Sequence, residues 1–314
     1  MSTTAEKSLF NPGLRGTLPP AEYTNNPMPH WGPTYPSPDT PYHYSDIDMI
    51  VVSYACDAAK AAALLPEELE LIDIPALPGQ AAVNHVFAKY RENDAIGPYT
   101  EFIVNIPVLH KGALYLYVPA IYVDNEAALT AGREFGGYPK KMAQITMRNY
   151  GNLFLNQMSR GSMQEKTADP NFSDVASSAV TKGGKLASVP LPARNIPQMP
   201  FPYNLLLPLP PATGKPQNLE LPTMGLLRIP GVGAGPDGVL GAQTLQLISS
   251  PWVITKADIF IGLDPSIELY RSKEDPIADL LPVDAVIGSY IVRGDLYTDP
   301  ADWSLIADLK KKKQ

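Results

Sequence analysis

The placement of proline constrains most strongly what this chain can fold into. The 314 residues include 34 prolines, which concentrate in residues 1–45 and again in residues 189–230. Proline lacks a backbone N–H, so dense proline excludes helices and central strands. We therefore expect residues 1–45 to wrap over the surface of the body. Residues 189–230 form a long stretch for a loop in a compact domain, which predicts a surface insertion or a binding lid.

Outside these stretches, short runs of β-branched and aromatic residues predict strands. Two helices are expected at residues 57–65 and 124–135, capped by Asp57 and Asp124, and the second stops at Gly136–Gly137. Because strands dominate and helices are few, we predict a mainly β fold, with a closed antiparallel barrel and helices packed outside. Residues 46–300 are expected to form one domain, followed by a basic tail over residues 301–314. The strands are predicted at residues 48–54, 81–90, 99–110, 113–123, 243–253, 257–262, 266–271 and 283–297.

Composition excludes several classes of protein. The net charge of −7 and the pI near 5.2 argue against a nucleic-acid-binding surface. No apolar run approaches the ~18–20 residues that would span a bilayer, so no membrane partner is expected. The single cysteine, Cys56, follows an apolar run and predicts a packed, inert thiol in a reducing compartment. We expect a cytoplasmic protein.

Motifs for metals and nucleotides are weak or missing. The glycine-rich run at residues 231–241 contains Pro236 and follows Pro230, which favours a turn or hairpin over a phosphate loop. The four histidines show no metal-ligand spacing, so neither a metal nor another cofactor is predicted. His85 alternates with Val83 and Phe87 on one strand face. It is interpreted either as a hydrogen-bonded core histidine or as a residue facing an interior pocket.

Two adjacent lysines, Lys140 and Lys141, carry the strongest chemical signal. They follow Tyr138 and Pro139, and the proline holds Tyr138 extended. On a strand the two lysines would point to opposite faces, so one could enter an interior while the other stays behind it. An ordinary lysine is neutral only to about 1 part in 2,500 at pH 7. Burial or a cationic neighbour raises that fraction, and a neutral lysine condenses with ketones.

Three blocks of this sequence resemble the acetoacetate decarboxylase family. They are VDNEAALTAGREFGGYPKKMAQ at residues 123–144, GPYTE at residues 97–101, and PSIELYRSKEDPIADLLPVDAVIGSYIVRGDL at residues 265–296. The resemblance implies a closed β-barrel of the acetoacetate decarboxylase type and assembly into homo-oligomers. Residues 149–240 are less alike and longer than in short members of the family.

The resemblance also implies roles for individual residues. Lys140 matches the lysine that forms the Schiff base, and Lys141 matches the neighbour held to lower its pKa. Glu101 matches the acid that handles the proton at carbon, and Tyr138 matches an aromatic residue that lines the substrate pocket. His85 is expected to assist in the pocket, since it or Val86 falls where the family has a second glutamate.

The chain departs from the family in its first core strand. Residues 45–52 read SDIDMIVV and contain no arginine, whereas acetoacetate decarboxylases have one there. We predict Schiff-base decarboxylation of a small β-keto acid, acetoacetate-like, to a ketone and carbon dioxide. Two alternatives stay open: an aldolase or dehydratase acting on a 2-oxo acid through the same iminium, and a non-catalytic barrel that binds a ligand.

Overall fold

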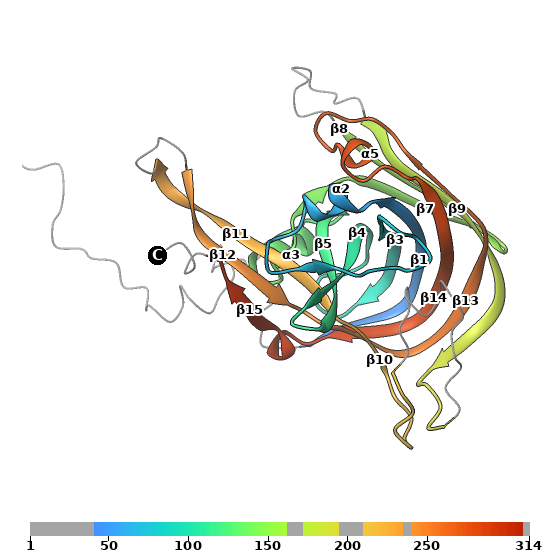
Figure 1. The fold of residues 1–314 in the computed structure, drawn as a ribbon. Coiled ribbons are helices and arrows are strands. Elements are labelled where there is room, and N and C mark those ends of the chain that lie inside the picture. Colours follow the sequence, from blue (N-terminus) through green and yellow to red (C-terminus); the bar gives the residue numbers. More distant parts are fainter. Residues whose placement is uncertain (1–40, 162–171, 195–209, 235–239, 310–314) are drawn as a thin grey trace, which may run out of the picture.

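The computed structural model describes residues 41–161, 172–194, 210–234 and 240–309. The described chain is mainly β, with a few short helices outside a curled sheet (Figure 1). The central strands are β1 (Tyr42–Asp57), β3 (Gln80–Asn93), β4 (Tyr99–His110), β5 (Ala113–Val123), β13 (Trp252–Leu269) and β14 (Ala285–Thr298). Around them lie β2 (Glu70–Leu71), β6 (Lys140–Met142), β7 (Gln144–Tyr150), β8 (Leu153–Gly161), β9 (Phe172–Val189), β10 (Leu219–Leu221), β11 (Thr223–Ala234), β12 (Leu240–Ser249) and β15 (Ser304–Asp308).

The predicted closed barrel is wrong, because the sheet is open. Its strands run in the order β15-β12-β11-β5-β4-β3-β1-β14-β13-β9-β8-β7, and a closed barrel would require the two end strands to pair. In the described residues β15 pairs with β12 and β7 pairs with β8. The free edge of β5 is instead shared by two parallel segments: β11 pairs at residues 116–117 and β6 at residues 121–123. In Figure 1, β11, β12 and β15 leave the curl as an arm.

Strands form within both proline-rich stretches, where none was expected. β1 begins at Tyr42, inside the segment expected to wrap without strands. Residues 219–230, the end of the second proline-rich stretch, form β10 and most of β11. Residues 1–40 and 195–209 lie outside the described residues, as does the basic cluster at 310–313. The two ends of the glycine-rich run, residues 231–234 and 240–241, lie in the antiparallel pair β11 and β12, which confirms a hairpin there, and residues 235–239 lie outside the described residues.

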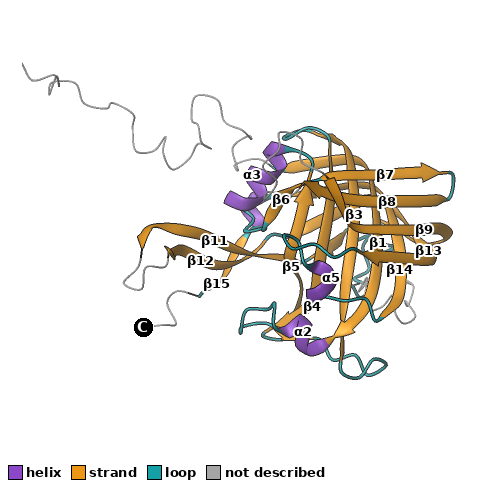
Figure 2. Ribbon diagram, turned by 90° about the horizontal axis from the view of Figure 1, so that it is seen from above, coloured by secondary structure: helices purple, strands orange, loops and turns teal. Residues whose placement is uncertain are grey.

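The two expected helices are present, one with the predicted N-terminal capping residue and the other with a cap one residue later. Helix α2 (Ala58–Ala62) begins after Asp57, whose carboxylate accepts from two backbone N–H groups. Helix α3 (Glu126–Glu134) is capped by Asn125, one residue after the predicted cap. Figure 2 shows α3 beside β6. Shorter turns of helix are α5 (Ile277–Leu280) and η1 (Pro300–Asp302), and no described helix is long and apolar enough to cross a membrane.

Strands β1, β3 and β4 are buried on both faces, and this creates two separate cores. Side chains alternate between the faces of a strand. On β3, Val86, Ala88 and Tyr90 face one core, while Val83 and Phe87 face the other. Burial on both faces explains the nearly continuous apolar sequence of these strands. The first core contains the candidate site.

Candidate active site

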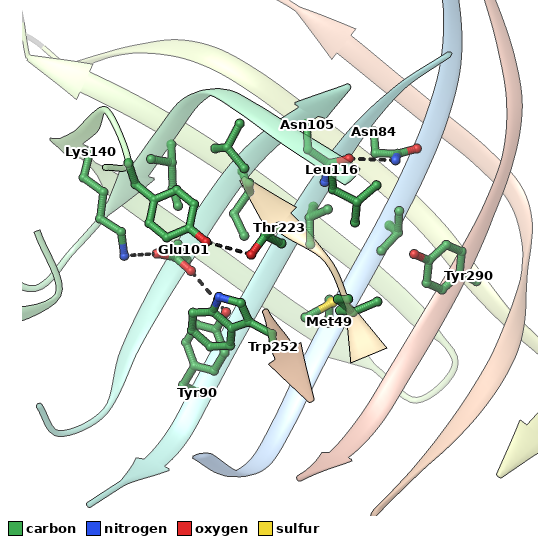
Figure 3. A pocket seen from close by; sticks show the side chains of 17 residues that line it. Met49, Asn84, Tyr90, Glu101, Asn105, Leu116, Lys140, Thr223, Trp252 and Tyr290 are labelled. Atoms are coloured by element: carbon green, nitrogen blue, oxygen red, sulfur yellow. Dashed lines mark hydrogen bonds and ion pairs between the residues drawn. The ribbon is translucent and has the colours of Figure 1, made fainter. Parts of the chain in front are cut away.

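A cavity with about 660 Å³ of space not filled by atoms opens on the face of β3 and β4 that belongs to the first core (Figure 3). Most of its lining is apolar, including Met49, Val51, Val86, Ile103, Val118 and Ile121. Lys140 and Glu101 both line the cavity, so the structure brings together the expected nucleophile and the expected acid.

Lys140 and Glu101 form a buried ion pair inside this cavity. Lys140 Nζ lies 2.5 Å from Glu101 Oε1, and the two side chains are only 5% and 1% exposed. The second carboxylate oxygen, Oε2, accepts from the hydroxyl of Tyr90 at 3.1 Å. Burial, followed by the nearby charge of Glu101, raises the pKa of Tyr90 well above its usual value, which keeps its hydroxyl proton in place. Both oxygens of Glu101 are therefore engaged.

The turn after α3 aims Lys140 at Glu101. Gly137 has φ +67°, which favours glycine, and a Cβ there would lie 2.7 Å from the backbone nitrogen of Leu227 on β11. The chain then pairs with β5 in parallel, with Lys140 beside Ile121. Gly132 on α3 supplies the space for the lysine, because a Cβ at this position would lie 2.3 Å from Lys140 Cε.

Aromatic rings surround the lysine on two sides. The ring centroids of Tyr99 and Tyr138 lie 5.8 and 5.9 Å from Lys140 Nζ. The hydroxyl of Tyr138 is held by Ser250 Oγ at 2.5 Å and Thr223 Oγ1 at 2.7 Å. Thr223 opens β11, in the second proline-rich stretch, and it lines the cavity together with Tyr138. This stretch thus contributes directly to the pocket wall.

Lys141 points away from the cavity. Its Nζ lies 2.6 Å from Asp275 Oδ1 and donates to the carbonyl of Glu274 at 3.1 Å. Asp275 is buried and also accepts from the hydroxyl of Tyr122 at 2.9 Å, while Arg160 Nε lies 2.7 Å from its other oxygen. The positive charge of Lys141 is therefore balanced on the opposite face of β6 from Lys140.

His85 does not line the cavity, contrary to the expectation that it assists in the pocket. The lining residues of β3 are Asn84, Val86 and Tyr90, so strand alternation turns His85 to the second core. Its Nε2 lies 3.1 Å from the hydroxyl of Tyr54, and burial lowers its pKa to about 3. The alternative interpretation, a hydrogen-bonded core histidine, is confirmed, and Val86 takes the place in the pocket.

Several pocket residues were missed from the sequence. Asn84 and Asn105 form a buried amide pair, with Asn84 Nδ2 donating to Asn105 Oδ1 at 2.8 Å. Their signal was available, since polar side chains in nearly continuous apolar strands require a partner. Tyr90 and Gly132 carried no distinct signal. In the part of the chain that the structure describes, no three His, Cys, Asp or Glu side chains gather in a way that could hold a metal ion.

Comparison with known proteins relates this chain to acetoacetate decarboxylases by sequence. The family described as acetoacetate decarboxylase matches residues 25–186. Acetoacetate decarboxylase 2 of Mesorhizobium japonicum is 25% identical over 261 residues, which cover 79% of this chain and 91% of that protein. Alignments to some other curated decarboxylases span only about half of those proteins, 54% for two from Paraburkholderia.

Solved structures share the fold. The crystal structure of acetoacetate decarboxylase from Legionella pneumophila superposes with a TM-score of 0.64 at 22% identity, covering 90% of this chain and 93% of that one. The enduracididine biosynthesis enzyme MppR, in complex with the condensation product of pyruvate and imidazole 4-carboxaldehyde, gives a TM-score of 0.62 at 18% identity. That match covers 95% of this chain and all of the other. At these identities the likeness establishes the fold alone.

Proposed function

The chain belongs to the acetoacetate decarboxylase family, and from this premise we propose that it decarboxylates a β-keto acid through a Schiff base on Lys140. The observation that carries the proposal is the buried pair of Lys140 Nζ and Glu101 Oε1, 2.5 Å apart in a mostly apolar cavity. A lysine in that position has a proton acceptor in contact with it and space beside it for a ketone.

The reaction begins with proton transfer and attack. Glu101 takes a proton from Lys140 Nζ, and the neutral amine adds to the substrate ketone. Glu101 gives this proton to the departing hydroxyl, water is lost, and the resulting iminium withdraws electrons from the bond to the carboxylate. That bond breaks, carbon dioxide leaves, and its electron pair forms an enamine. Glu101 takes up a second proton from solvent and delivers it to the enamine carbon, and water hydrolyses the resulting iminium to the product ketone and protonated Lys140.

The apolar lining favours the decarboxylation step. Lys140 is the one positively charged side chain among the described residues that line the cavity. A substrate carboxylate next to Val118, Ile121 or Leu221 would have lost water without gaining a second cation. Because the carboxylate charge moves into the iminium as carbon dioxide leaves, such surroundings disfavour the charged reactant more than the transition state.

Lys141 is proposed to position Lys140. Its ion pair with Asp275 ties β6 to the segment before α5 and fixes which lysine faces the cavity. Tuning of Lys140 by the charge of Lys141 stays a prediction. The same is true of homo-oligomer assembly and a cytoplasmic location.

Borohydride trapping tests the Schiff base. Incubation with acetoacetate or acetone and reduction should add a mass to the intact protein that peptide mapping assigns to Lys140. Lys140→Met should abolish the adduct, and the neighbouring Lys141→Met, the matched control, should keep it. An adduct that persists in Lys140→Met would refute the mechanism. Absence of any adduct from ketones and keto acids would favour the non-catalytic ligand-binding alternative.

A second candidate uses the same iminium for aldol addition or dehydration of a 2-oxo acid. It is favoured by the fold shared with MppR, which was solved with a condensation product of pyruvate. Release of carbon dioxide separates the two candidates. Carbon dioxide from 3-oxo acids supports decarboxylation. A pyruvate adduct together with consumption of an aldehyde, and no carbon dioxide, would replace it with the aldol reaction.

A further inference from the structure

The cavity has a second polar end, remote from Lys140. Asn84 and Asn105 lie side by side on β3 and β4, and Figure 3 shows them well away from Lys140 and Glu101. Between the two polar ends the paired side chains are Val86 and Ile103. Glu101, Ile103 and Asn105 therefore follow one another along the face of β4 that lines the cavity.

The amide end is ordered by a chain of hydrogen bonds. Ser53 Oγ donates to Asn84 Oδ1 at 2.6 Å, and Asn84 Nδ2 donates to Asn105 Oδ1 at 2.8 Å. The side-chain oxygen of Asn105 is therefore engaged, and its Nδ2 group is the last donor in this series of hydrogen bonds. Within the described ranges no residue accepts from Asn105 Nδ2, and Asn105 as a whole residue is only 5% exposed. An amide donor that lines a cavity and has no protein acceptor favours a ligand with an acceptor.

The acceptor should be neutral. No arginine, lysine or histidine lines the amide end among the described residues; the lining side chains nearest in the figure are Leu116 and the two asparagines. A second carboxylate would lose its water there without a countercharge, which is costly. A carbonyl or ether oxygen accepts from Asn105 without that cost.

The distance between the two ends sets the length of the ligand. Glu101 and Asn105 are four residues apart on one strand, so their Cα atoms are separated by about 13 Å. About 3 Å of this belongs to the hydrogen bond to Asn105 and a similar length to the contact of Lys140 with Glu101. Roughly 7 Å remains, or about five covalent bonds in an extended chain. Acetoacetate carries only a methyl group beyond its ketone and cannot reach Asn105.

Resting on the function proposed above, we infer that the substrate is a 3-oxo acid with a long tail. Beyond the ketone, the tail is apolar for about four carbon atoms and ends at a neutral oxygen that accepts from Asn105 Nδ2. The ketone reacts with Lys140, the apolar part lies along Val86 and Ile103, and the terminal oxygen selects the substrate.

Two methyl ketones test the binding assignment without requiring turnover. Octan-2-one and 6-methoxyhexan-2-one have the same number of chain atoms, and the second places an ether oxygen five bonds from the ketone carbon. Borohydride trapping gives the concentration of each that half-saturates the Lys140 adduct. We expect the ether ketone to half-saturate at an about tenfold lower concentration, the usual effect of one buried hydrogen bond. Equal concentrations would overturn the assignment.

Asn105→Asp is the informative variant, because its carboxylate oxygen still accepts from Asn84 while the donor is removed. The preference for the ether ketone should fall to about one or reverse. An undiminished preference in a variant that unfolds at the wild-type temperature would overturn the role of Asn105. If the variant does not fold, the wild-type ratio alone decides.

Release of carbon dioxide separates failure of this inference from failure of the proposed function. The substrates are acetoacetate, 3-oxononanoate and 7-methoxy-3-oxoheptanoate, the last two being the acids that yield the two ketones. A tenfold preference in trapping with no carbon dioxide from any acid would retain the binding assignment and reject decarboxylation. Carbon dioxide from all three at similar efficiency would retain decarboxylation and reject the long-tailed substrate. No ketone adduct at all would reject both.

Discussion

Replacing Gly132 by alanine should separate activity from stability. A Cβ at Gly132 would lie 2.3 Å from Cε, 2.6 Å from Cδ and 3.0 Å from Nζ of Lys140. Carbon atoms in contact normally sit about 3.5–4.0 Å apart, so the lysine side chain must move by about 1.2 Å or more. The atoms in conflict are the far end of a flexible side chain, which can move without shifting the backbone. Its 2.5 Å contact with Glu101 would then be lost.

The substitution should lower kcat strongly and change the free energy of unfolding only slightly. A displacement of about 1 Å of a reacting group can cost about a hundredfold in rate, so we expect the kcat of carbon dioxide release to fall by about that factor. Alanine is a better helix residue than glycine by about 1 kcal/mol, and this offsets part of the cost of breaking the ion pair. The free energy of unfolding should therefore change by no more than about 2 kcal/mol.

Urea unfolding, steady-state turnover and borohydride trapping measure these effects on one preparation. Thr130→Ala on the same helix is the matched control, because the hydroxyl of Thr130 donates to the carbonyl of Glu126 and makes no hydrogen bond to Lys140 among the described residues. It should turn over at the wild-type rate. Wild-type turnover in Gly132→Ala would refute the argument that this glycine makes room for the nucleophile. Loss of folding would refute the argument that the lysine relieves the conflict.

Two further predictions concern His85 and Lys141, two titratable residues that do not line the cavity. Burial lowers the pKa of His85 to about 3, so the folded state binds its proton more weakly than the unfolded state, with an ordinary value near 6.5. The stability that follows is complete above about pH 6.5 and is lost as the pH falls towards 3. Between pH 7 and 4.5 the loss is about 2–3 kcal/mol. His85→Phe should remove that part of the pH dependence in urea unfolding, and an equal dependence in variant and wild type would contradict the assignment. Lys141→Met should lower kcat by about fivefold or less, the range of a partly exposed ion pair, and leave the pH–rate profile in place. A profile displaced by a full pH unit would instead support tuning of Lys140 by the charge of Lys141.

The site was partly predictable because its key residues are close in sequence or embedded in motifs. The lysine pair after Pro139 and the glutamate in GPYTE pointed to one pocket, and the structure places Lys140 and Glu101 in contact. It was harder to predict which side chains of β3 face the pocket. Both faces of this strand are buried, so the sequence has no exposed polar side that would show which residues point which way. His85 was therefore placed towards the pocket when Asn84 and Val86 occupy it.

The parts of the fold that were missed have clear physical causes. β7, β8 and β9 are rich in Ser, Thr, Asn and Gly, and many of their side chains are exposed, so their sequences lacked an apolar run. The opening of the sheet could not be predicted either. It depends on a parallel pairing of β6 and β11 with one edge of β5, and short parallel contacts leave no pattern in local sequence.

The register of β6 gives the two adjacent lysines their different surroundings. Shifting a strand by one residue exchanges its two faces, so a slip of β6 would turn Lys141 towards Glu101 and Lys140 towards Asp275. The described contacts oppose this slip on both faces: Gly132 leaves space where Lys140 lies, and Asp275 binds Lys141. A pair of lysines is chemically symmetric, and the surroundings are not. The identity of the nucleophile is therefore a property of the register of a three-residue strand, held by a glycine on one side and a buried carboxylate on the other.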